Sequence, residues 1–270
     1  MRFLRRYPIW CLFLLLVAAL MIWTLWGNRA LVTTGYQVES QEIPRSFDSL
    51  KIAQISDLHN TRFGSNNQKL VAMLEEAQPD LIAITGDLID SRRTDPDVAI
   101  AFAQKAVKIA PVYYIPGNHE ARLPEDYTKL KAALTDLGVV VLENESVTLE
   151  KDGQEITFSG LMDPDFGIPW PEIDADSYQV VLSHRPELFD QYVSLGFDLV
   201  LTGHAHGGQF RLPFIGGLFA PHQGFFPKYD SGIHAKENTT MVVSRGLGNS
   251  LFPLRFNNRP EVVVITLESI

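Results

Sequence analysis

Five short segments of this 270-residue chain are rich in aspartate, histidine and asparagine, whose oxygen and nitrogen atoms bind divalent metal ions. Such donors suit Zn, Mn and Fe, whereas structural zinc and iron–sulfur sites use thiolates, and the single cysteine, Cys11, lies outside all five segments. One Asp-x-His or Gly-Asp pair is typical of a solvated turn, but five segments together indicate a shared site. The candidate metal ligands are Asp57, His59, Asp87, Asn118, His184, His204 and His206.

The spacing of these residues fits two neighbouring ions. Asp57 and His59 are separated by one residue and can turn toward the same ion, and we interpret Asp87 as a carboxylate shared between both ions. A shared carboxylate holds two ions about 3.5–4 Å apart, close enough to activate one water and to stabilise the attacking and leaving oxygens together. The sequence therefore predicts a two-metal hydrolase whose ions, Mn, Zn or Fe, keep open positions for water and substrate.

Short apolar runs rich in strand-forming residues precede the first three ligand segments, which recur about every 30 residues. Helical patterns lie between these runs. The expected strands cover residues 51–55, 81–85 and 111–115, and the expected helices cover 68–77 and 95–109. This alternation predicts parallel strands joined by right-handed crossovers, with the ligands gathered beyond the carboxyl ends of the strands.

After residue 138 the pattern changes to short strands separated by turns. These strands cover residues 139–142, 147–150, 156–159, 180–183, 198–202, 241–244 and 262–267, with a helix over 188–195. Runs this apolar need cover on both faces, so the predicted fold class is α/β, with two mixed β-sheets packed as a sandwich and flanked by helices. The catalytic domain is expected to span residues 49–270, and residues 29–48 form a connection that includes an edge strand.

Residues 1–28 are expected to form an N-terminal transmembrane helix. The run from Tyr7 to Asn28 carries no charge and is long enough to cross the hydrocarbon core of a bilayer. Only Arg29 closely follows the run, whereas three arginines precede it, namely Arg2, Arg5 and Arg6. This bias places the amino terminus in the cytoplasm and the catalytic domain on the outer side. The alternative is a cleaved signal peptide, which the length of the run and the lack of a clear small-x-small cleavage site disfavour.

The charge of the domain disfavours nucleic acid as a partner. The first 27 residues hold three of the 23 basic residues and no acidic ones, so the remainder has a net charge of −12. Affinity for a duplex rests mainly on the neutralisation of phosphates by Lys and Arg, which an acidic surface does not provide. The expected partners are a phosphoester substrate and the bilayer.

Taken in order, the five segments resemble the calcineurin-like metallophosphoesterase superfamily. Its pattern DxH, GDxxD, GNH(D/E), H and GHxH is matched without a missing position, and the resemblance covers residues 50–268. The resemblance implies a first metal site of Asp57, His59, Asp87 and His206, and a second of Asp87, Asn118, His184 and His204.

The same resemblance implies a catalytic group that is not a metal ligand. His119 is similar to the family's catalytic histidine, which protonates the leaving oxygen or stabilises charge on the phosphoryl group, with Glu120 orienting its ring. Asp90 is similar to a residue that fixes a histidine ligand through the second ring N–H.

Residues outside the five segments bear on the substrate. Arg62, Arg185 and Arg245 lie near ligand segments or a Gly-rich turn and are candidate phosphate contacts, with structural salt bridges as the alternative. His222 and His234 are expected to be surface residues. The apolar segment 207–227 is expected to form a wall or lid that holds an acyl chain or touches the bilayer, or else to pack over the sheet edge. Its apolar residues include Leu212, Phe214, Leu218, Phe219, Phe225 and Phe226.

Segments 207–227, 244–248 and 254–256 resemble a membrane-associated branch of phosphodiesterases of the YaeI/YkuE type, to which a UDP-2,3-diacylglucosamine pyrophosphatase of lipid A synthesis is similar. This resemblance implies a lipid-linked phosphodiester or pyrophosphate as substrate. Such a UDP-sugar lipid is made on the cytoplasmic side, opposite to the side that the arginine bias indicates, so a cytoplasm-facing domain stays an alternative. A phosphomonoesterase or protein phosphatase is the alternative activity. A non-catalytic scaffold is disfavoured because no expected ligand is missing.

Overall fold

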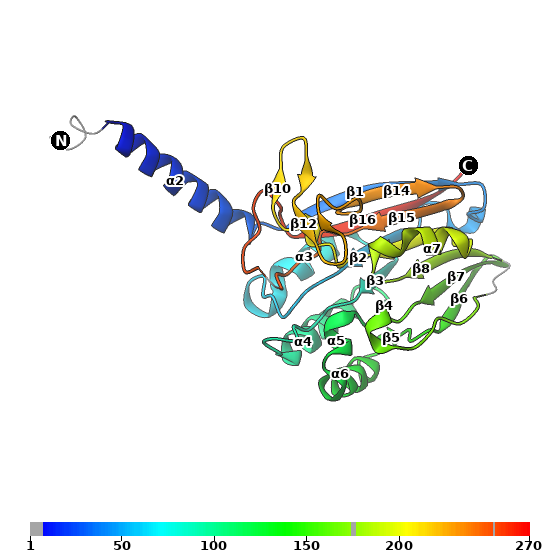
Figure 1. Ribbon diagram of the computed structural model, residues 1–270. Coiled ribbons are helices and arrows are strands. Elements are labelled where there is room, and N and C mark those ends of the chain that lie inside the picture. Colours follow the sequence, from blue (N-terminus) through cyan, green and yellow to red (C-terminus); the bar gives the residue numbers. More distant parts are fainter. Residues whose placement is uncertain (1–7, 174–176, 251) are drawn as a thin grey trace.

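Two six-stranded mixed sheets lie face to face at the centre of the fold, as predicted (Figure 1). The computed structural model describes residues 8–173, 177–250 and 252–270. In the first sheet the order is β1-β16-β2-β3-β4-β5, and the strands β2 to β5 run parallel. Their bounds are Val32–Ser40 for β1, Glu261–Ser269 for β16, Lys51–Ile55 for β2, Leu81–Thr85 for β3, Val112–Ile115 for β4 and Val140–Val141 for β5.

The second sheet has the order β14-β15-β9-β8-β7-β6, with four parallel central strands between two antiparallel edge strands. The sequence analysis missed the edge strand β14, whose short run alternates between half-buried and exposed residues. The bounds are Gly232–Lys236 for β14, Thr239–Val243 for β15, Leu199–Thr202 for β9, Tyr178–Leu182 for β8, Gln154–Gly160 for β7 and Ser146–Lys151 for β6.

Alternating side chains of the central strands fill cores on both faces of each sheet. In β3, Ala83 packs into the core between the sheets, while Ile82 and Ile84 pack into the core beneath the helices. In β9, Leu199 and Leu201 likewise enter the core between the sheets. Because successive side chains of a strand point to opposite faces, a continuous apolar run is required when both faces are covered.

Helices cover the outer faces of the sandwich. The helices α3, α4 and α6 contribute to the core on the outer face of the first sheet, and α7 contributes to that of the second. Their bounds are Gln68–Ala77 for α3, Pro96–Ala106 for α4, Pro124–Asp136 for α6 and Phe189–Ser194 for α7, with the one-turn helix Asn118–Ala121 as α5. The expected helix 188–195 is shorter than predicted because its first turn is a 3-10 helix, Pro186–Leu188.

The apolar segment after His206 folds into two small antiparallel hairpins. Arg211–Leu212 (β10) pairs with Gly216–Gly217 (β11), and Phe219–Ala220 (β12) pairs with Gly224–Phe225 (β13). In Figure 1 the labels β10 and β12 lie beside the point where the N-terminal helix meets the domain.

That N-terminal helix, α2 (Pro8–Gly27), projects away from the domain, which confirms the predicted apolar helix (Figure 1). Residues Ile9–Gly27 have a mean hydropathy of 2.4 and none of this window is buried, so length and composition permit a membrane span. The three arginines on which the predicted orientation depends, together with Tyr7, lie outside the described residues.

Candidate metal centre

The candidate ligands follow the carboxyl ends of strands from both sheets. Asp57 follows β2, Asp87 follows β3, and Asn118 follows β4 in the first sheet. His184 follows β8 and His204 follows β9 in the second sheet. Because the sheets face each other with these strand ends at one end of the sandwich, the five segments converge there, as the crossover argument predicts.

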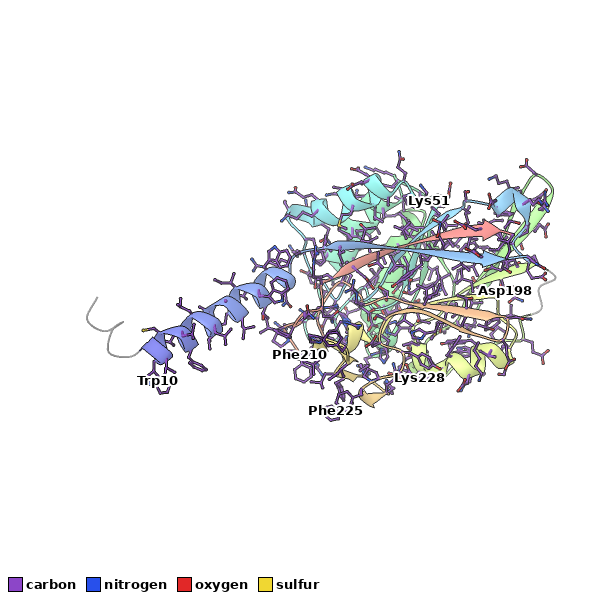
Figure 2. The ribbon with its side chains drawn as sticks, turned by 90° about the horizontal axis from the view of Figure 1, so that it is seen from above. Trp10, Lys51, Asp198, Phe210, Phe225 and Lys228 are labelled. Atoms are coloured by element: carbon purple, nitrogen blue, oxygen red, sulfur yellow. The ribbon has the colours of Figure 1, made fainter. Side chains whose placement is uncertain are left out.

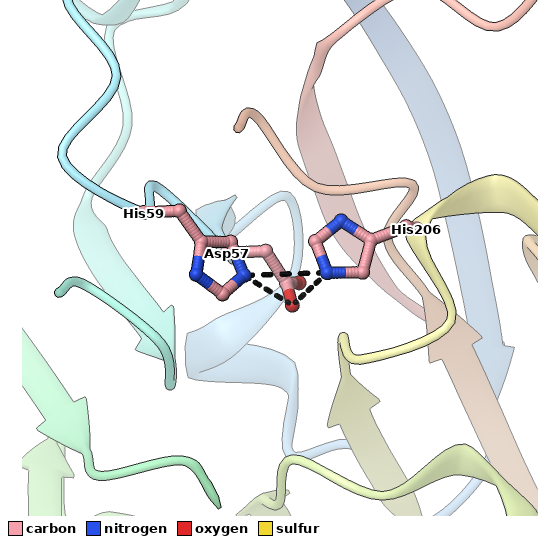
Figure 3. A group of neighbouring side chains, drawn as sticks. All are labelled: Asp57, His59 and His206. Carbon is pink, nitrogen blue, oxygen red and sulfur yellow. Dashed lines mark hydrogen bonds and ion pairs between the residues drawn. The ribbon is translucent and has the colours of Figure 1, made fainter. Parts of the chain in front are cut away.

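A first cluster consists of Asp57, His59 and His206, all buried (Figure 3). The Nε2 atoms of His59 and His206 are 3.2 Å apart, and they lie 3.8 Å and 3.5 Å from Oδ1 of Asp57. Ligands held at about 2.0–2.2 Å around a tetrahedral ion are ~3.4 Å from one another. The donor atoms are therefore spaced to enclose one divalent ion.

A second cluster consists of Asp87, His184 and His204, also buried, with Asn118 beside it. Nε2 of His184 lies 3.1 Å from Oδ2 of Asp87, 3.1 Å from Oδ1 of Asn118 and 3.2 Å from Nδ1 of His204. The same Oδ2 of Asp87 is 3.6 Å from Nε2 of His59 in the first cluster. Asp87 thus faces both clusters, the position that a bridging carboxylate requires.

One ligand of the second cluster is poorly satisfied without a cation. The Asn118 amide points its oxygen at the His184 and His204 nitrogens and its nitrogen at Arg122, although exchanging the two atoms would satisfy the hydrogen bonds better. A cation held among these donors would favour the orientation with the oxygen inward, so the residues present fit a metal pair.

The protonation states of the ligands also fit cation binding. Burial lowers the pKa of His206 to about 3 and holds the pKa of His204 well below its usual value, so both rings are neutral and have a lone pair to offer. Burial opposes ionisation of Asp87, but the neighbouring histidines, His184 first among them, together outweigh it and hold the pKa of that carboxyl well below its usual range. In return, burial lowers the pKa of His184, but Asp87 together with more distant carboxylates outweighs it and raises that pKa to about 10. A cation bound there would displace the proton on Nε2, since Nδ1 of the same ring contacts the Thr85 carbonyl at 2.8 Å.

Backbone strain concentrates at the candidate ligands. Five of them adopt left-handed backbone conformations, with φ of 51° at Asp57, 44° at His59, 54° at Asp87, 65° at His204 and 48° at His206. Each such conformation costs about 1–3 kcal/mol in a non-glycine residue and persists only where the surroundings enforce it. Positive φ values at five neighbouring ligands indicate that these loops adopt a backbone conformation that positions the ligand side chains at a cost in stability.

Two glycines in the motifs keep space for the ligands. A Cβ on Gly117 would lie 2.3 Å from Oδ1 of Asp87. A Cβ on Gly203 would lie 1.8 Å from the Ser56 hydroxyl oxygen and 2.5 Å from Oδ2 of Asp57. The glycines of GNH and GHxH are therefore required by the close approach of the carboxylates.

His119 lies beside the first cluster, where its ring centroid is 4.5 Å from that of His59. The backbone N–H of Ser91 donates to Nδ1 at 2.9 Å, and Nε2 lies 3.1 Å from the Ser250 hydroxyl. Burial lowers the pKa of His119 to about 4, so the ring is neutral near pH 7 and carries its proton on Nε2. This geometry suits a group that donates a proton or hydrogen bond from Nε2.

Glu120 differs from the expectation that it orients the ring of His119. Its carboxylate accepts the backbone N–H groups of Asp87 at 3.0 Å, Ile89 at 3.1 Å and Gly117 at 2.8 Å. Burial raises the pKa of Glu120 to about 7, and two of these N–H donors oppose that rise. The expected role was wrong because the side chain turns into the loops and ties two ligand segments together, while the Ser91 N–H orients the ring.

Asp90 lies where a residue that fixes a histidine would be needed. Its carboxylate oxygens are 4.0 Å from Nδ1 of His59 and 4.0 Å from Nδ1 of His119. The carboxylate faces the unpartnered Nδ1 of His59 but is beyond hydrogen-bond distance of it.

The candidate phosphate contacts of the sequence analysis form salt bridges instead. Arg62 pairs with Asp95 at 2.6 Å on the surface, Arg245 pairs with Glu261, and Arg185 pairs with buried Asp163. These arginines are not among the described residues that line the cavity of about 180 Å³ over the two clusters. The lining residues are Asp87, Arg92, Asn118, His119, Arg122, His204, Ala205, His206, Gln209, Phe219, Pro221, His222, Ser250 and Phe252. Arg92 and Arg122 thus place positive charge at the cavity wall, and Arg122 also pairs with Asp165 at 3.2 Å.

His222 has an exposed side chain, as expected of a surface residue, but it also contacts a ligand of the second cluster. Its Nδ1 lies 2.9 Å from Nε2 of His204, the ring nitrogen that faces away from the second cluster, and 2.7 Å from Nη1 of Arg185. The only sequence signal for this contact is the place of His222 in the segment that follows His206. His234, by contrast, contacts the Ser231 carbonyl at 3.1 Å, within its own hairpin.

Comparison with known proteins assigns the chain to a family. Residues 50–208 match the family model described as calcineurin-like phosphoesterase. The chain is 33% identical over 247 residues to the uncharacterized metallophosphoesterase YkuE of Bacillus subtilis. This alignment covers 88% of this chain and 85% of that protein. It is 31% identical over 228 residues to the phosphodiesterase YaeI of Escherichia coli, and this alignment covers 80% of this chain and 82% of that protein.

A third relative is the transmembrane protein with metallophosphoesterase domain of Bos taurus, which is 28% identical over 260 residues, 87% of this chain and 57% of that protein. The family match and the first two relatives show that the chain belongs to the calcineurin-like phosphoesterases. With its buried His and Asp clusters, it is a metal-dependent phosphoric ester hydrolase.

Proposed function

We propose that this hydrolase is a membrane-anchored phosphodiesterase that acts on a lipid-linked phosphodiester or pyrophosphate, such as UDP-2,3-diacylglucosamine. The observation that carries the catalytic part is the pair of clusters joined by Asp87 beneath a cavity that His119 also lines. The name of the YaeI phosphodiesterase supports a diester over a monoester.

The proposed chemistry divides between the cations and the chain. Two divalent cations, when bound, would lower the pKa of a shared water and neutralise the phosphate. Asp57, His59, Asp87 and His206 would hold one, and Asp87, Asn118, His184 and His204 the other.

The remaining groups act on the substrate. His119 presents its Nε2 proton toward the cavity for the leaving oxygen, while the Ser91 N–H holds the ring and Ser250 accepts from it before substrate binds. Arg92 and Arg122 offer positive charge to phosphate oxygens at the cavity wall. Glu120 keeps the Asp87 and Asn118 loops in register.

The lipid part of the proposal is supported by α2 and by the lining of the cavity. An exposed apolar helix of 20 residues begins the described chain, and one relative is named as a transmembrane protein. Phe219 and Phe252, together with Ala205 and Pro221, give the cavity apolar surface beside its polar groups. For orientation we keep the arginine bias, which places the domain on the outer side. Alkaline phosphatase fused after residue 28 and after residue 270 tests that side, since the fusion is active only outside the cytoplasm.

Hydrolysis by the purified full-length protein tests the activity. With Mn²⁺, Zn²⁺ or Fe²⁺, we expect turnover of bis-p-nitrophenyl phosphate and UDP-2,3-diacylglucosamine to exceed that of p-nitrophenyl phosphate. Turnover restricted to monoesters would overturn the diesterase proposal and favour a phosphomonoesterase. Turnover of simple diesters without any lipid-linked or pyrophosphate substrate would overturn the lipid part alone.

A further inference from the structure

We propose that the two small hairpins and the loop at residues 252–254 form a surface that dips into the lipid bilayer around the base of α2. This inference rests on the proposed membrane anchoring and adds a specific contact between the catalytic domain and the lipid. We call this surface the interfacial patch. It comprises Phe214, Ile215, Phe225, Phe226, Phe252 and Leu254.

The interfacial patch gathers exposed aromatic side chains in one place. Phe214 at the turn of the first hairpin is fully exposed, and Phe225 and Phe226 in the second are 71% and 61% exposed. Within the described residues beyond α2, the exposed aromatic side chains are these three and Phe252. Phe214 and Phe226 also have positive φ values, 66° and 56°, a strained conformation that buries neither ring. Exposed aromatic rings cost solubility in water but are favourable at a membrane surface.

The position of α2 fixes where the lipid surface would lie. The amide of Asn28, directly after the helix, accepts the Arg255 N–H at 2.8 Å and donates to the Arg255 carbonyl at 2.8 Å. Asn249 also donates to Asn28, at 3.1 Å, and the Arg259 guanidinium lies 5.2 Å from the Trp26 ring. The loop that carries Phe252 and Leu254 is therefore bonded directly to the base of the helix.

The figures agree with this placement. In Figure 1 the hairpins labelled β10 and β12 stand beside the domain end of α2. In the perpendicular view of Figure 2, Phe210 and Phe225 lie on the side of the domain from which α2 leaves, with Trp10 at the far end of the helix. If α2 crosses the bilayer, the water–lipid boundary at its domain end passes next to the interfacial patch.

The charge around the patch favours a lipid surface over other occupants. Residues 207–229 and 244–260 contain no Asp or Glu, although the chain as a whole has a net charge of −9. Lys228 and Arg29 are exposed within or beside these segments. Asp230, at the base of the first hairpin, is paired with Arg211 at 3.1 Å. Apolar side chains flanked mainly by cations match the acyl boundary and anionic head groups of a bilayer.

The interfacial patch is continuous with the cavity over the metal clusters. Phe252 belongs to the patch and also lines the cavity, beside Ser250, whose hydroxyl contacts the catalytic-histidine candidate His119. Phe219 also lines the cavity, and its ring centroid lies 5.5 Å from that of Phe225. A lipid-linked phosphoester could therefore reach the cavity while its acyl chains stay in the membrane.

Site-directed spin labelling of the full-length chain tests this surface. Single cysteines replace Phe214, Phe225, Leu16 or Leu195 in a Cys11→Ser background, and the labelled proteins are reconstituted in phosphatidylcholine–phosphatidylglycerol vesicles. Leu16 reports on α2, and Leu195, 47% exposed at the end of α7, is the control away from α2. Accessibility to oxygen and to a water-soluble nickel complex measures the depth of each label.

We expect labels at Phe214 and Phe225 to report a depth about 5–10 Å below the head groups, the label at Leu16 to lie deeper, and the label at Leu195 to stay in water. Labels at Phe214 and Phe225 that are as water-accessible as Leu195, with Leu16 in lipid, would overturn this inference and leave the anchor in place. Spin–spin broadening at Phe225 that grows with the protein-to-lipid ratio would also overturn it, because it would assign the patch to a second copy. A water-exposed Leu16 would overturn both the anchor and the patch.

A kinetic variant separates the patch from catalysis. Phe225→Ser combined with Phe226→Ser changes residues that do not line the cavity. We expect turnover of bis-p-nitrophenyl phosphate to be unchanged and turnover of a vesicle-embedded lipid phosphodiester to fall at least tenfold. An equal effect on both substrates would contradict the inference. A wild-type protein that hydrolyses neither diester would refute the proposed function instead.

Discussion

Replacing His222 by alanine should weaken metal binding although His222 is outside all five motifs. Its Nδ1 is 2.9 Å from Nε2 of His204, and a metal-bound imidazole commonly donates its second N–H to such a partner. Nη1 of Arg185, 3.4 Å from the same nitrogen, is itself a donor and cannot accept that proton; it lies 2.7 Å from Nδ1 of His222 and shares that acceptor with His204. Without His222, the His204 ring loses the group that fixes its tautomer and orientation.

The magnitude follows from the kind of contact and its exposure. Loss of an acceptor behind a metal ligand typically costs 10–100-fold in metal affinity or activity, which corresponds to about 1.4–2.7 kcal/mol. The His222 side chain is 49% exposed, so water can take over part of its role. We therefore expect an effect of about tenfold, the lower end of the range.

The assay is a calorimetric titration of metal-free protein with Mn²⁺, combined with kcat as a function of Mn²⁺ concentration. We expect His222→Ala to weaken one of the two binding steps and His222→Gln, which restores an acceptor oxygen, to recover most of the loss. The matched control is His234→Ala. Among the described residues, the hydrogen-bond partner of His234 is the nearby Ser231 carbonyl, which is not part of the metal site. Equal metal affinity of the His222→Ala variant and the wild type would refute the assigned contact.

Three further outcomes follow from the site. His119→Ala should reduce kcat by roughly 10²–10⁴-fold while both metals stay bound; loss of metal together with activity would show that the ring is a ligand. Gly203→Ala should destabilise the fold by about 1–3 kcal/mol and weaken metal binding, because the new Cβ would lie 1.8 Å from the Ser56 hydroxyl and 2.5 Å from Asp57; an unchanged Tm and metal content would contradict that packing. Chelation with EDTA should lower Tm reversibly, since a ligand at 100 times its Kd adds about 2.7 kcal/mol, and a Tm that is indifferent to chelator would argue against bound cations in the folded state.

The sequence was sufficient to predict the layout of the fold. Apolar runs ending at Asp57, Asp87 and Asn118 identified β2, β3 and β4, because a buried strand and the loop after it leave a local pattern. The interleaved helix α3 was predicted with its observed bounds, Gln68–Ala77, since its apolar side chains recur at helical spacing. The motif residues were found because each motif is short and contiguous in the chain.

The parts that sequence reasoning missed depend on contacts between distant segments. His222 reaches His204 only because the hairpin segment folds back over the second cluster. Fully buried Arg255, whose Nη2 is 3.3 Å from Nδ1 of His206, comes from a loop near the carboxyl terminus. Glu120 and Arg122 were misjudged or overlooked because a residue's place beside a motif does not fix the direction of its side chain.

Counting metal ions in the purified protein by mass spectrometry, together with anomalous diffraction at the metal edge, tests the dinuclear centre most directly. The wild type should contain two ions per chain, about 3.5–4 Å apart on either side of Asp87, and Asp87→Ala should retain neither at full occupancy. A single ion in the wild type, or two fully occupied ions in Asp87→Ala, would contradict a site built around that shared carboxylate.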